Sequence, residues 1–318
     1  MANFQNGITI TGSFDLSATT ENTSSVGYLW FDGTNFKYST YGGAGTWSAG
    51  GDLNTSRQYL AGAGTQNAGL AFGGATPSTV SCTEEYNGSS WSTGGNLIME
   101  RINSGGAGTQ NAGLAFGGYN NSTISCTEEY NGSSWSEGGA LINAQSYMGG
   151  AGTQNAGLKF GGFTPSYSVS SCTEEYNGSS WSAGGALITG RSIVRGAGTQ
   201  DSGLAFGGYL SGNGVSCTEE YDGSSWSTGG ALSTARYALA GTGTQNAGLA
   251  FGGTPTLSCT EQYDGSSWST GGALITATAY SAGAGIQTAG LTFGGRTPSN
   301  NPIPCTEEYT VGVVACTL

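Results

Sequence analysis

The sequence predicts an all-β protein, a six-bladed β-propeller of four-stranded antiparallel blades. The main observation is an internal repeat, because an eleven-residue block that starts at Gly64 returns at Gly108, Gly152, Gly198, Gly243 and Gly285. A second block, residues 82–91, has a counterpart behind each copy. Start-to-start steps of 42 to 46 residues indicate a repeat architecture, in which each unit is too small to bury its own apolar face and must pack on its neighbours.

Each repeat contains the pattern of four short strands separated by glycine turns. In the first repeat, we expect strands at 58–66, 70–72 and 82–86, and a fourth strand that carries Trp91. Gly73-Gly74 ends the second strand, and Asn87-Gly88 forms the tight turn between the third and fourth strands. No stretch has helical periodicity, so four strands per repeat predict the blade of a propeller.

One tyrosine and one tryptophan recur at fixed positions of the repeat, and we expect them to pack between blades. They are Tyr86, Tyr130, Tyr176, Tyr221, Tyr263 and Tyr309, with Trp47, Trp91, Trp135, Trp181, Trp226 and Trp268.

The position of Trp47 predicts how the ring closes. The first three strands occur six times, but a tryptophan-bearing fourth strand follows them only five times. The strand around Trp47 is expected to complete the sixth blade, so that both chain ends close the ring. Alternatively, residues 313–318 supply this strand and residues 26–51 begin a seventh blade. We therefore predict an N-terminal β extension over 1–44, with a hairpin turn at Asp32-Gly33, and a propeller over 45–318.

The composition excludes several classes of protein. There are 60 glycines, no histidine, 8 Lys and Arg and 20 Asp and Glu, for a net charge of -12. This charge disfavours nucleic acid and anionic membranes as partners. The sequence has no transmembrane stretch and no signal peptide, so we expect release from the host cytoplasm by lysis. Without histidine, a Ser-His or Cys-His pair or a metal-ligand cluster, we expect no catalytic residue, metal or cofactor, and no enzymatic activity.

Four further repeat positions are polar or small. The cysteines at 82, 126, 172, 217, 259 and 305 are expected to be small buried residues, too far apart on a ring for disulfides. Glu84, Glu85 and their equivalents are expected to pair with repeated arginines or face solvent, rather than bind a cation. Gln66 and its equivalents are expected to line the axis, where they satisfy strand-end backbone groups or bind a sugar or water column.

The repeats resemble the kelch family over about residues 45–310. The resemblance rests on the Gly-Gly after the second strand, on the Tyr and Trp of the next hairpin, and on an arginine ten residues beyond the Trp, at Arg57, Arg101, Arg191 and Arg236. Gln145 and Thr278 replace this arginine in two repeats, so an Arg–carboxylate pair would be dispensable there. Some kelch relatives are copper oxidases with a Tyr–Cys cofactor, and the missing histidine ligands exclude that activity here.

A second resemblance concerns composition. Residues 1–25 and 27–38 look like segments of bacteriophage tail fibres, and the Gly/Ser/Thr/Asn-rich repeats look like kelch-type proteins of marine phages. This resemblance implies a virion structural protein, as a tail fibre, a tail accessory or a capsid decoration. The N-terminal segment would bind other virion proteins, and the propeller would attach to a glycan or protein of the host surface.

The loops that follow the second strand vary among repeats, which predicts a recognition surface on a uniform scaffold. These loops and the N-terminal hairpin contain the candidate contact residues Trp30, Phe31, Phe36, Tyr38, Tyr119, Phe163, Tyr167, Tyr209 and Arg296. The alternative is a cellular kelch-type interaction module that binds a protein partner through the same loops.

Overall fold

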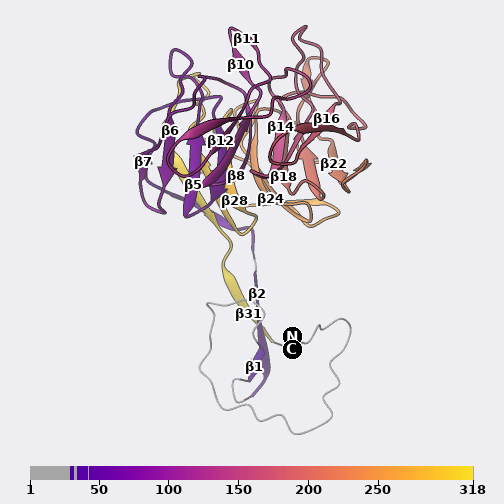
Figure 1. Cartoon of the computed structure of the whole chain (residues 1–318). Coiled ribbons are helices and arrows are strands. Elements are labelled where there is room, and N and C mark those ends of the chain that lie inside the picture. Colours follow the sequence, from indigo (N-terminus) through magenta and orange to yellow (C-terminus); the bar gives the residue numbers. More distant parts are fainter. Residues whose placement is uncertain (1–28, 32–33, 42, 318) are drawn as a thin grey trace. The chain divides into compact units, whose positions relative to one another are not determined.

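The computed structural model describes residues 29–31, 34–41 and 43–317, and it confirms the six-bladed propeller (Figure 1). The chain divides into two compact units. One unit, Ala44–Thr310, is the propeller, and the other includes β1 (Leu29–Phe31), β2 (Phe36–Tyr41) and β31 (Val313–Thr317). The described residues contain no helix with the length and apolarity that a membrane crossing needs.

Each blade is a four-stranded antiparallel sheet, and we number the blades one to six in chain order. The first strands are β4 (Ala61–Thr65), β8 (Gly105–Thr109), β14 (Gly149–Thr153), β18 (Arg195–Gly198), β24 (Ala240–Thr244) and β28 (Ala282–Ile286). The second strands are β5 (Ala68–Phe72), β9 (Ala112–Phe116), β15 (Ala156–Phe160), β19 (Gly203–Phe206), β25 (Ala247–Phe251) and β29 (Ala289–Phe293). The third strands are β6 (Thr83–Tyr86), β12 (Thr127–Tyr130), β16 (Thr173–Tyr176), β22 (Thr218–Tyr221), β26 (Thr260–Tyr263) and β30 (Thr306–Thr310). The fourth strands are β7 (Trp91–Thr93), β13 (Trp135–Gly138), β17 (Trp181–Gly184), β23 (Trp226–Thr228), β27 (Trp268–Thr270) and β3 (Thr46–Ala49). The loops of blades two and four add small hairpins, β10 (Tyr119–Asn120) with β11 (Ser122–Thr123) and β20 (Tyr209–Leu210) with β21 (Asn213–Gly214).

The first strand of each blade lies nearest the axis, and glycine lets these strands approach one another. A Cβ atom on Gly62 would lie 2.6 Å from the ring of Phe293 and 3.2 Å from the Cβ of Ala282, both in blade six. Only a residue without a side chain fits there. The first strand starts at Ala61 rather than at residue 58 as predicted, because Tyr59 has a φ of 61° and interrupts the extended backbone.

The ring closes through the N-terminal strand, as predicted. β3 pairs with β30, with Trp47 opposite Tyr309, so blade six contains strands from both ends of the chain. The alternative closure by residues 313–318 is wrong, since β31 pairs with β2 in the separate three-stranded sheet β1-β2-β31. In that sheet β1 and β2 form the predicted antiparallel pair, with Phe31 opposite Phe36. The turn residues 32 and 33 lie outside the described residues.

The core lies between the blades, and each repeated tryptophan forms the centre of one seam. Trp135 of blade two packs edge-on against Phe72 of blade one, with ring centroids 5.0 Å apart. Its Nε1 donates a hydrogen bond of 2.9 Å to Oγ1 of Thr83, also in blade one. The equivalent Trp–Phe pairs are Trp47–Phe251, Trp91–Phe293, Trp181–Phe116, Trp226–Phe160 and Trp268–Phe206. Each seam therefore combines the burial of aromatic rings with an indole N–H that has a hydrogen-bond acceptor.

The repeated arginines are fully buried and pair with the first of the two adjacent glutamates in the third strand, such as Glu84. Arg57 lies 3.2 Å from Glu84, and Arg236 lies 3.0 Å from Glu261. The pairs Arg101–Glu128 and Arg191–Glu219 are equivalent. Burial lowers the pKa of the Arg57 guanidinium, while the facing carboxylate of Glu84 raises it. In these four blades the first glutamate thus pairs with arginine, as the sequence indicated, and does not face solvent.

Blades three and six lack this arginine, and other groups stabilise the buried first glutamate there. In blade three Gln145 replaces it, but Lys159 on β15 places its Nζ 3.6 Å from Oε1 of Glu174. The equivalent of Lys159 in most blades is an alanine, such as Ala71. In blade six no cation of the described residues forms an ion pair with Glu307, which accepts backbone N–H groups of Ile275 and Thr276 at 2.8 Å. Both blades thus do without an Arg–carboxylate pair, as predicted, but in blade three a lysine from the second strand supplies the positive charge, which the sequence did not indicate.

This exchange predicts a compensating pair of substitutions. Lys159→Ala should lower the free energy of unfolding by about 3–5 kcal/mol, because Glu174 remains buried without its cation. Adding Gln145→Arg should recover most of the loss, since Arg and Ala at these two positions form the pattern of blades one, two, four and five. Urea denaturation of both variants checks this, and a Lys159→Ala protein as stable as the parent would contradict it.

Candidate binding face

The second of the two adjacent glutamates in the third strand, Glu85 in blade one, accepts a hydrogen bond from a tyrosine of the next blade. Oη of Tyr130 in blade two donates a hydrogen bond of 2.5 Å to Oε1 of Glu85 in blade one. The same bond joins Tyr86 to Glu308, Tyr176 to Glu129, Tyr221 to Glu175 and Tyr263 to Glu220. Between blades five and six, Gln262 instead donates to Oη of Tyr309 at 2.8 Å. The second ring of glutamates is half-buried and accepts tyrosine hydroxyls rather than pairing with arginine, an inter-blade bond that the sequence did not predict.

The repeated glutamines satisfy strand-end backbone groups, and they do not line the axis. Nε2 of Gln66 donates to the carbonyl oxygens of Gly290 at 3.1 Å and Tyr309 at 2.7 Å, both in blade six. The other five glutamines make the equivalent pair of bonds, and residues of the first strands line the axial cavity instead. Their amide donors are therefore already used within the fold.

The repeated cysteines are free thiols but are not buried, contrary to expectation. Cys172 is exposed and the other five are half-buried. The physical reason is their place at the loop before the third strand, where the Cys82 carbonyl accepts the N–H of Gly73 and ends the pairing of the sheet. Cys316 lies on β31 with its backbone opposite Tyr38, and its side chain lies outside the described part.

The blades differ from one another at a ring of residues around the axis, two positions after the repeated arginine. We call it the inner ring; it comprises Tyr59, Asn103, Tyr147, Ile193, Ala238 and Tyr280. All six have positive φ angles, from 52° to 61°. The N–H of Asn103 donates to the carbonyl of Tyr59 at 2.9 Å, and four equivalent bonds link other neighbouring blades. Positive φ is unfavourable for residues other than glycine, and such strain often occurs at functional sites.

A second set of dissimilar residues surrounds the inner ring. The residue after each Gly-Gly forms a β-bridge with the residue just before the inner ring, as Phe163 does with Ser146. We call this set the outer ring; it comprises Ala75, Tyr119, Phe163, Tyr209, Thr254 and Arg296. The two rings together place twelve positions that vary among the blades on a single face of the propeller.

Aromatic side chains of the two rings, together with Tyr237 next to the inner ring, form a continuous arc across blades three to five. Phe163 lies 5.8 Å from Tyr147 and 6.4 Å from Tyr209, measured between ring centroids. Tyr209 in turn lies 5.1 Å from Tyr237. These side chains are half-buried, so they combine packing with an accessible edge. The arc offers apolar ring surface and phenolic hydroxyl groups to a partner.

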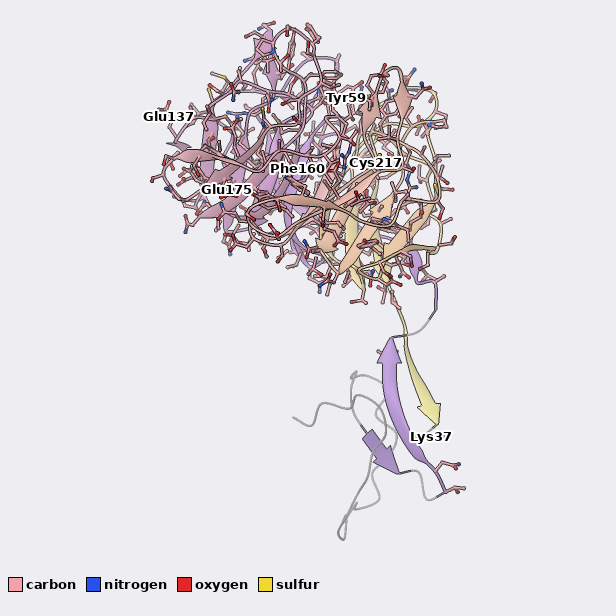
Figure 2. All side chains as sticks on the ribbon, turned by 90° about the vertical axis from the view of Figure 1, so that its right-hand side faces the viewer. Lys37, Tyr59, Glu137, Phe160, Glu175 and Cys217 are labelled. Carbon is pink, nitrogen blue, oxygen red and sulfur yellow. The ribbon has the colours of Figure 1, made fainter. Side chains whose placement is uncertain are left out.

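Arg296 stands over the aromatic pair of blades six and one. Its Cζ lies 4.5 Å from the ring centroid of Tyr280, and its Nη1 donates to Oη of Tyr59 at 2.9 Å. Its Nε is buried without a hydrogen-bond partner, and no described carboxylate lies within ion-pair distance. Burial raises the pKa of Tyr280, so its phenol stays neutral. Figure 2 labels Tyr59 in the upper part of the propeller, above Phe160.

The predicted contact residues fall into two groups. Tyr119, Phe163, Tyr209 and Arg296 belong to the outer ring, and Tyr167, 68 % exposed, lies in the loop after Phe163. Trp30, Phe31, Phe36 and Tyr38 lie on β1 and β2, and their side chains are outside the described part. The inner-ring tyrosines Tyr59, Tyr147 and Tyr280 were not predicted. Their signal is a repeat position that holds four different residue types between blocks that repeat almost unchanged along the chain.

Comparison with solved structures identifies a similar fold. The structure described as "Structure of YjhT" matches with a TM-score of 0.72 and 12% sequence identity, over 85% of this chain and 100% of that chain. At this identity the match shows the propeller fold alone. No protein-family model matches the sequence. No curated protein matches it either.

The Tyr–Glu bonds predict how stability depends on pH. Burial and then the hydrogen bond to Glu85 raise the pKa of Tyr130 to about 12, and Tyr86, Tyr176, Tyr221 and Tyr263 share this shift. Because the folded pKa exceeds the unfolded value of about 10, the contribution is complete below pH 10. It should be lost as the pH rises from about 10 towards 12, which denaturation at stepped alkaline pH would measure.

The variant Tyr130→Phe isolates one of these bonds. At neutral pH it should lower the free energy of unfolding by about 1–3 kcal/mol, since Glu85 loses its donor. It should also flatten the alkaline decline. Glu85→Gln is the matched control, because it reproduces the natural Gln262–Tyr309 seam and should be tolerated better. An unchanged pH profile in Tyr130→Phe would refute the assignment.

Proposed function

We propose that the protein is a non-enzymatic structural protein of a bacteriophage virion, whose propeller binds a glycan or protein on the host surface. The observation that carries the recognition role is the division of residues in the propeller. Residues that join the blades repeat almost without change, whereas the dissimilar residues gather in the inner and outer rings on one face. A constant scaffold with a variable face is the arrangement of a recognition module.

The chemistry of the face suits a glycan. Tyrosine and arginine are the residue types that most often dominate binding energy at interfaces. Tyr59, Tyr280 and Arg296 combine π-faces, which can stack on a sugar ring, with hydroxyl and guanidinium groups that hydrogen-bond its polar substituents. The side chains also pack against one another, so little conformational freedom would be lost on binding.

Attachment to the virion is the second part of the proposal. β1, β2 and β31 bring both ends of the chain into one small sheet that forms a compact unit of its own. In this proposal the small sheet contacts other virion proteins, and the propeller binds the host surface. The phage assignment is supported by the resemblance of residues 27–38 to tail-fibre segments, and the absence of histidine supports binding rather than catalysis.

Binding of the full chain to a glycan array and to host cells tests the recognition face. Arg296→Thr should weaken binding by about tenfold or more, since arginine truncation at an interface commonly costs over 1 kcal/mol. Thr254 occupies the same outer-ring position in blade five, so this variant is expected to fold. Glu137→Ala is the matched control, because Glu137 is exposed outside the rings and Ala183 is its equivalent in blade three. Unchanged binding by Arg296→Thr would exclude this face.

Mass spectrometry of purified virus particles tests the location. The protein should be found in particles in a constant ratio to other virion proteins. If it is absent from particles, and the rings instead capture a protein of the cell that makes it, the alternative role as a cellular kelch-type interaction module would be favoured.

A further inference from the structure

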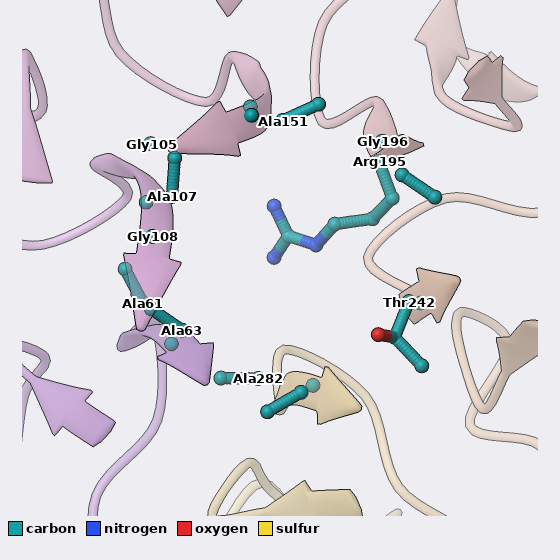
Figure 3. Close-up of a pocket in the computed structure, with 18 of the residues that line it drawn as sticks. Ala61, Ala63, Gly105, Ala107, Gly108, Ala151, Arg195, Gly196, Thr242 and Ala282 are labelled. Atoms are coloured by element: carbon teal, nitrogen blue, oxygen red, sulfur yellow. The ribbon is translucent and has the colours of Figure 1, made fainter. Parts of the chain in front are cut away.

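An arginine side chain projects into the axial cavity of the propeller. The cavity has a volume of about 230 Å³ and is lined mainly by glycine and alanine of the six first strands. Figure 3 shows Arg195, on β18, directed into the space between these strands. At the same register position, opposite the phenylalanine of the second strand, the other blades have Ala61, Gly105, Gly149, Ala240 and Ala282. Blade four alone therefore departs from a small residue there.

The guanidinium of Arg195 has no carboxylate partner among the described residues. Its Nε donates to the carbonyl of Leu239 at 2.8 Å, and no ion pair involves its terminal nitrogens. By contrast, each buried cation of the blade interiors faces a glutamate; these are Arg57, Arg101, Lys159, Arg191 and Arg236. An enclosed charge without a counter-charge is unfavourable, so proteins normally pair it.

Arg195 nevertheless keeps its charge at neutral pH. Enclosure by protein lowers its pKa to about 10, and the side chain is only half-buried because its end meets the open space of the cavity. No aspartate or glutamate lines this space. The cavity is therefore a positively charged site inside a protein whose net charge is -12.

The walls of the cavity add hydrogen-bonding groups. Each first strand is the edge strand of its blade, so part of its backbone N–H and C=O groups has no partner within the sheet. The hydroxyl of Thr242 donates to the carbonyl oxygen of Gly285 in the next blade, so polar groups of this wall form hydrogen bonds. Alanine and glycine side chains leave the centre open.

We propose that the axial cavity binds a small oxyanion, a carboxylate, phosphate or sulfate group, on the terminal nitrogens of Arg195. The planar fork of a guanidinium donates two parallel hydrogen bonds to such a group, which matches both its charge and its geometry. The site lies among the first strands and uses neither Arg296 nor the outer ring. It borders the inner ring, because Tyr280 interacts electrostatically with Arg195 and the Leu239 carbonyl that accepts from Arg195 follows Ala238, but it shares no residue with the outer ring.

Isothermal titration calorimetry of the full chain with sodium phosphate, sodium sulfate and sodium acetate tests this site. Ionic strength is held constant with sodium chloride. At least one anion should bind saturably at one site per chain, and the preferred anion identifies the oxyanion class. Arg195→Ala should weaken this binding roughly tenfold to a hundredfold, the effect of losing charge-assisted hydrogen bonds.

The controls separate this site from the recognition face. Arg195→Ala should keep the fold, checked by circular dichroism, because Ala240 and Ala282 occupy the same position; Arg195→Gln serves as a second variant that keeps the length of the side chain. Arg296→Thr should bind the anion as the parent does. The proposal is overturned if none of the three anions binds saturably, if both Arg195 variants bind like the parent, or if Arg296→Thr abolishes binding.

Discussion

The rest of the structure depends on the tryptophan seams. A single four-stranded blade has too little apolar surface to be stable alone, so each blade must cover its neighbour. The tryptophan of one blade covers the phenylalanine of the blade before it and donates to its threonine, as Trp135 does to Phe72 and Thr83. Because every seam uses the same contacts, the last seam must also be formed, and the strand around Trp47 forms it. Closure of the ring is a consequence of this requirement.

The polar residues of the repeat strengthen the same seams. The second glutamate accepts a tyrosine hydroxyl from the next blade, and each glutamine amide donates to two carbonyl groups of the blade before it. The first glutamate is neutralised by a buried cation or, in blade six, held by backbone N–H groups. None of these interactions uses a side chain of the two rings or a residue that lines the axial cavity. The two rings and the axial cavity lie outside them, so a change such as Arg296→Thr alters the face and spares the seams.

Blade count, the approximate positions of the strands and the closing strand could be predicted because each depends on the spacing of repeated residues. The start of the first strand was misplaced, since the backbone angle at Tyr59 cannot be seen in the sequence. The inner ring could not be predicted, since a positive φ at Tyr59 or Ile193 leaves no mark on residue type. The role of Lys159 was not predicted, because this lysine replaces an arginine that lies on a different segment of the repeat. A comparison of equivalent positions shows only that Gln145 stands in place of the arginine. Arg195 is visible in the sequence as a departure from small residues, but its direction into the cavity depends on the radial arrangement of the strands. Strand spacing could not show that the second glutamate is bonded to a neighbouring tyrosine.

Near-identity of the blades has a consequence for how the gene can change. Stretches of similar sequence about 44 residues apart favour unequal recombination, which exchanges, duplicates or deletes whole units. Loss or gain of a unit would alter the angle that every remaining blade must span, and the N-terminal strand would no longer reach its partner, β30, in the same geometry. Exchange of one unit for another keeps the circle at six members and moves a pair of ring residues to a new place. Recombination in this gene can therefore produce new combinations of surface residues while selection for closure holds the number of units constant.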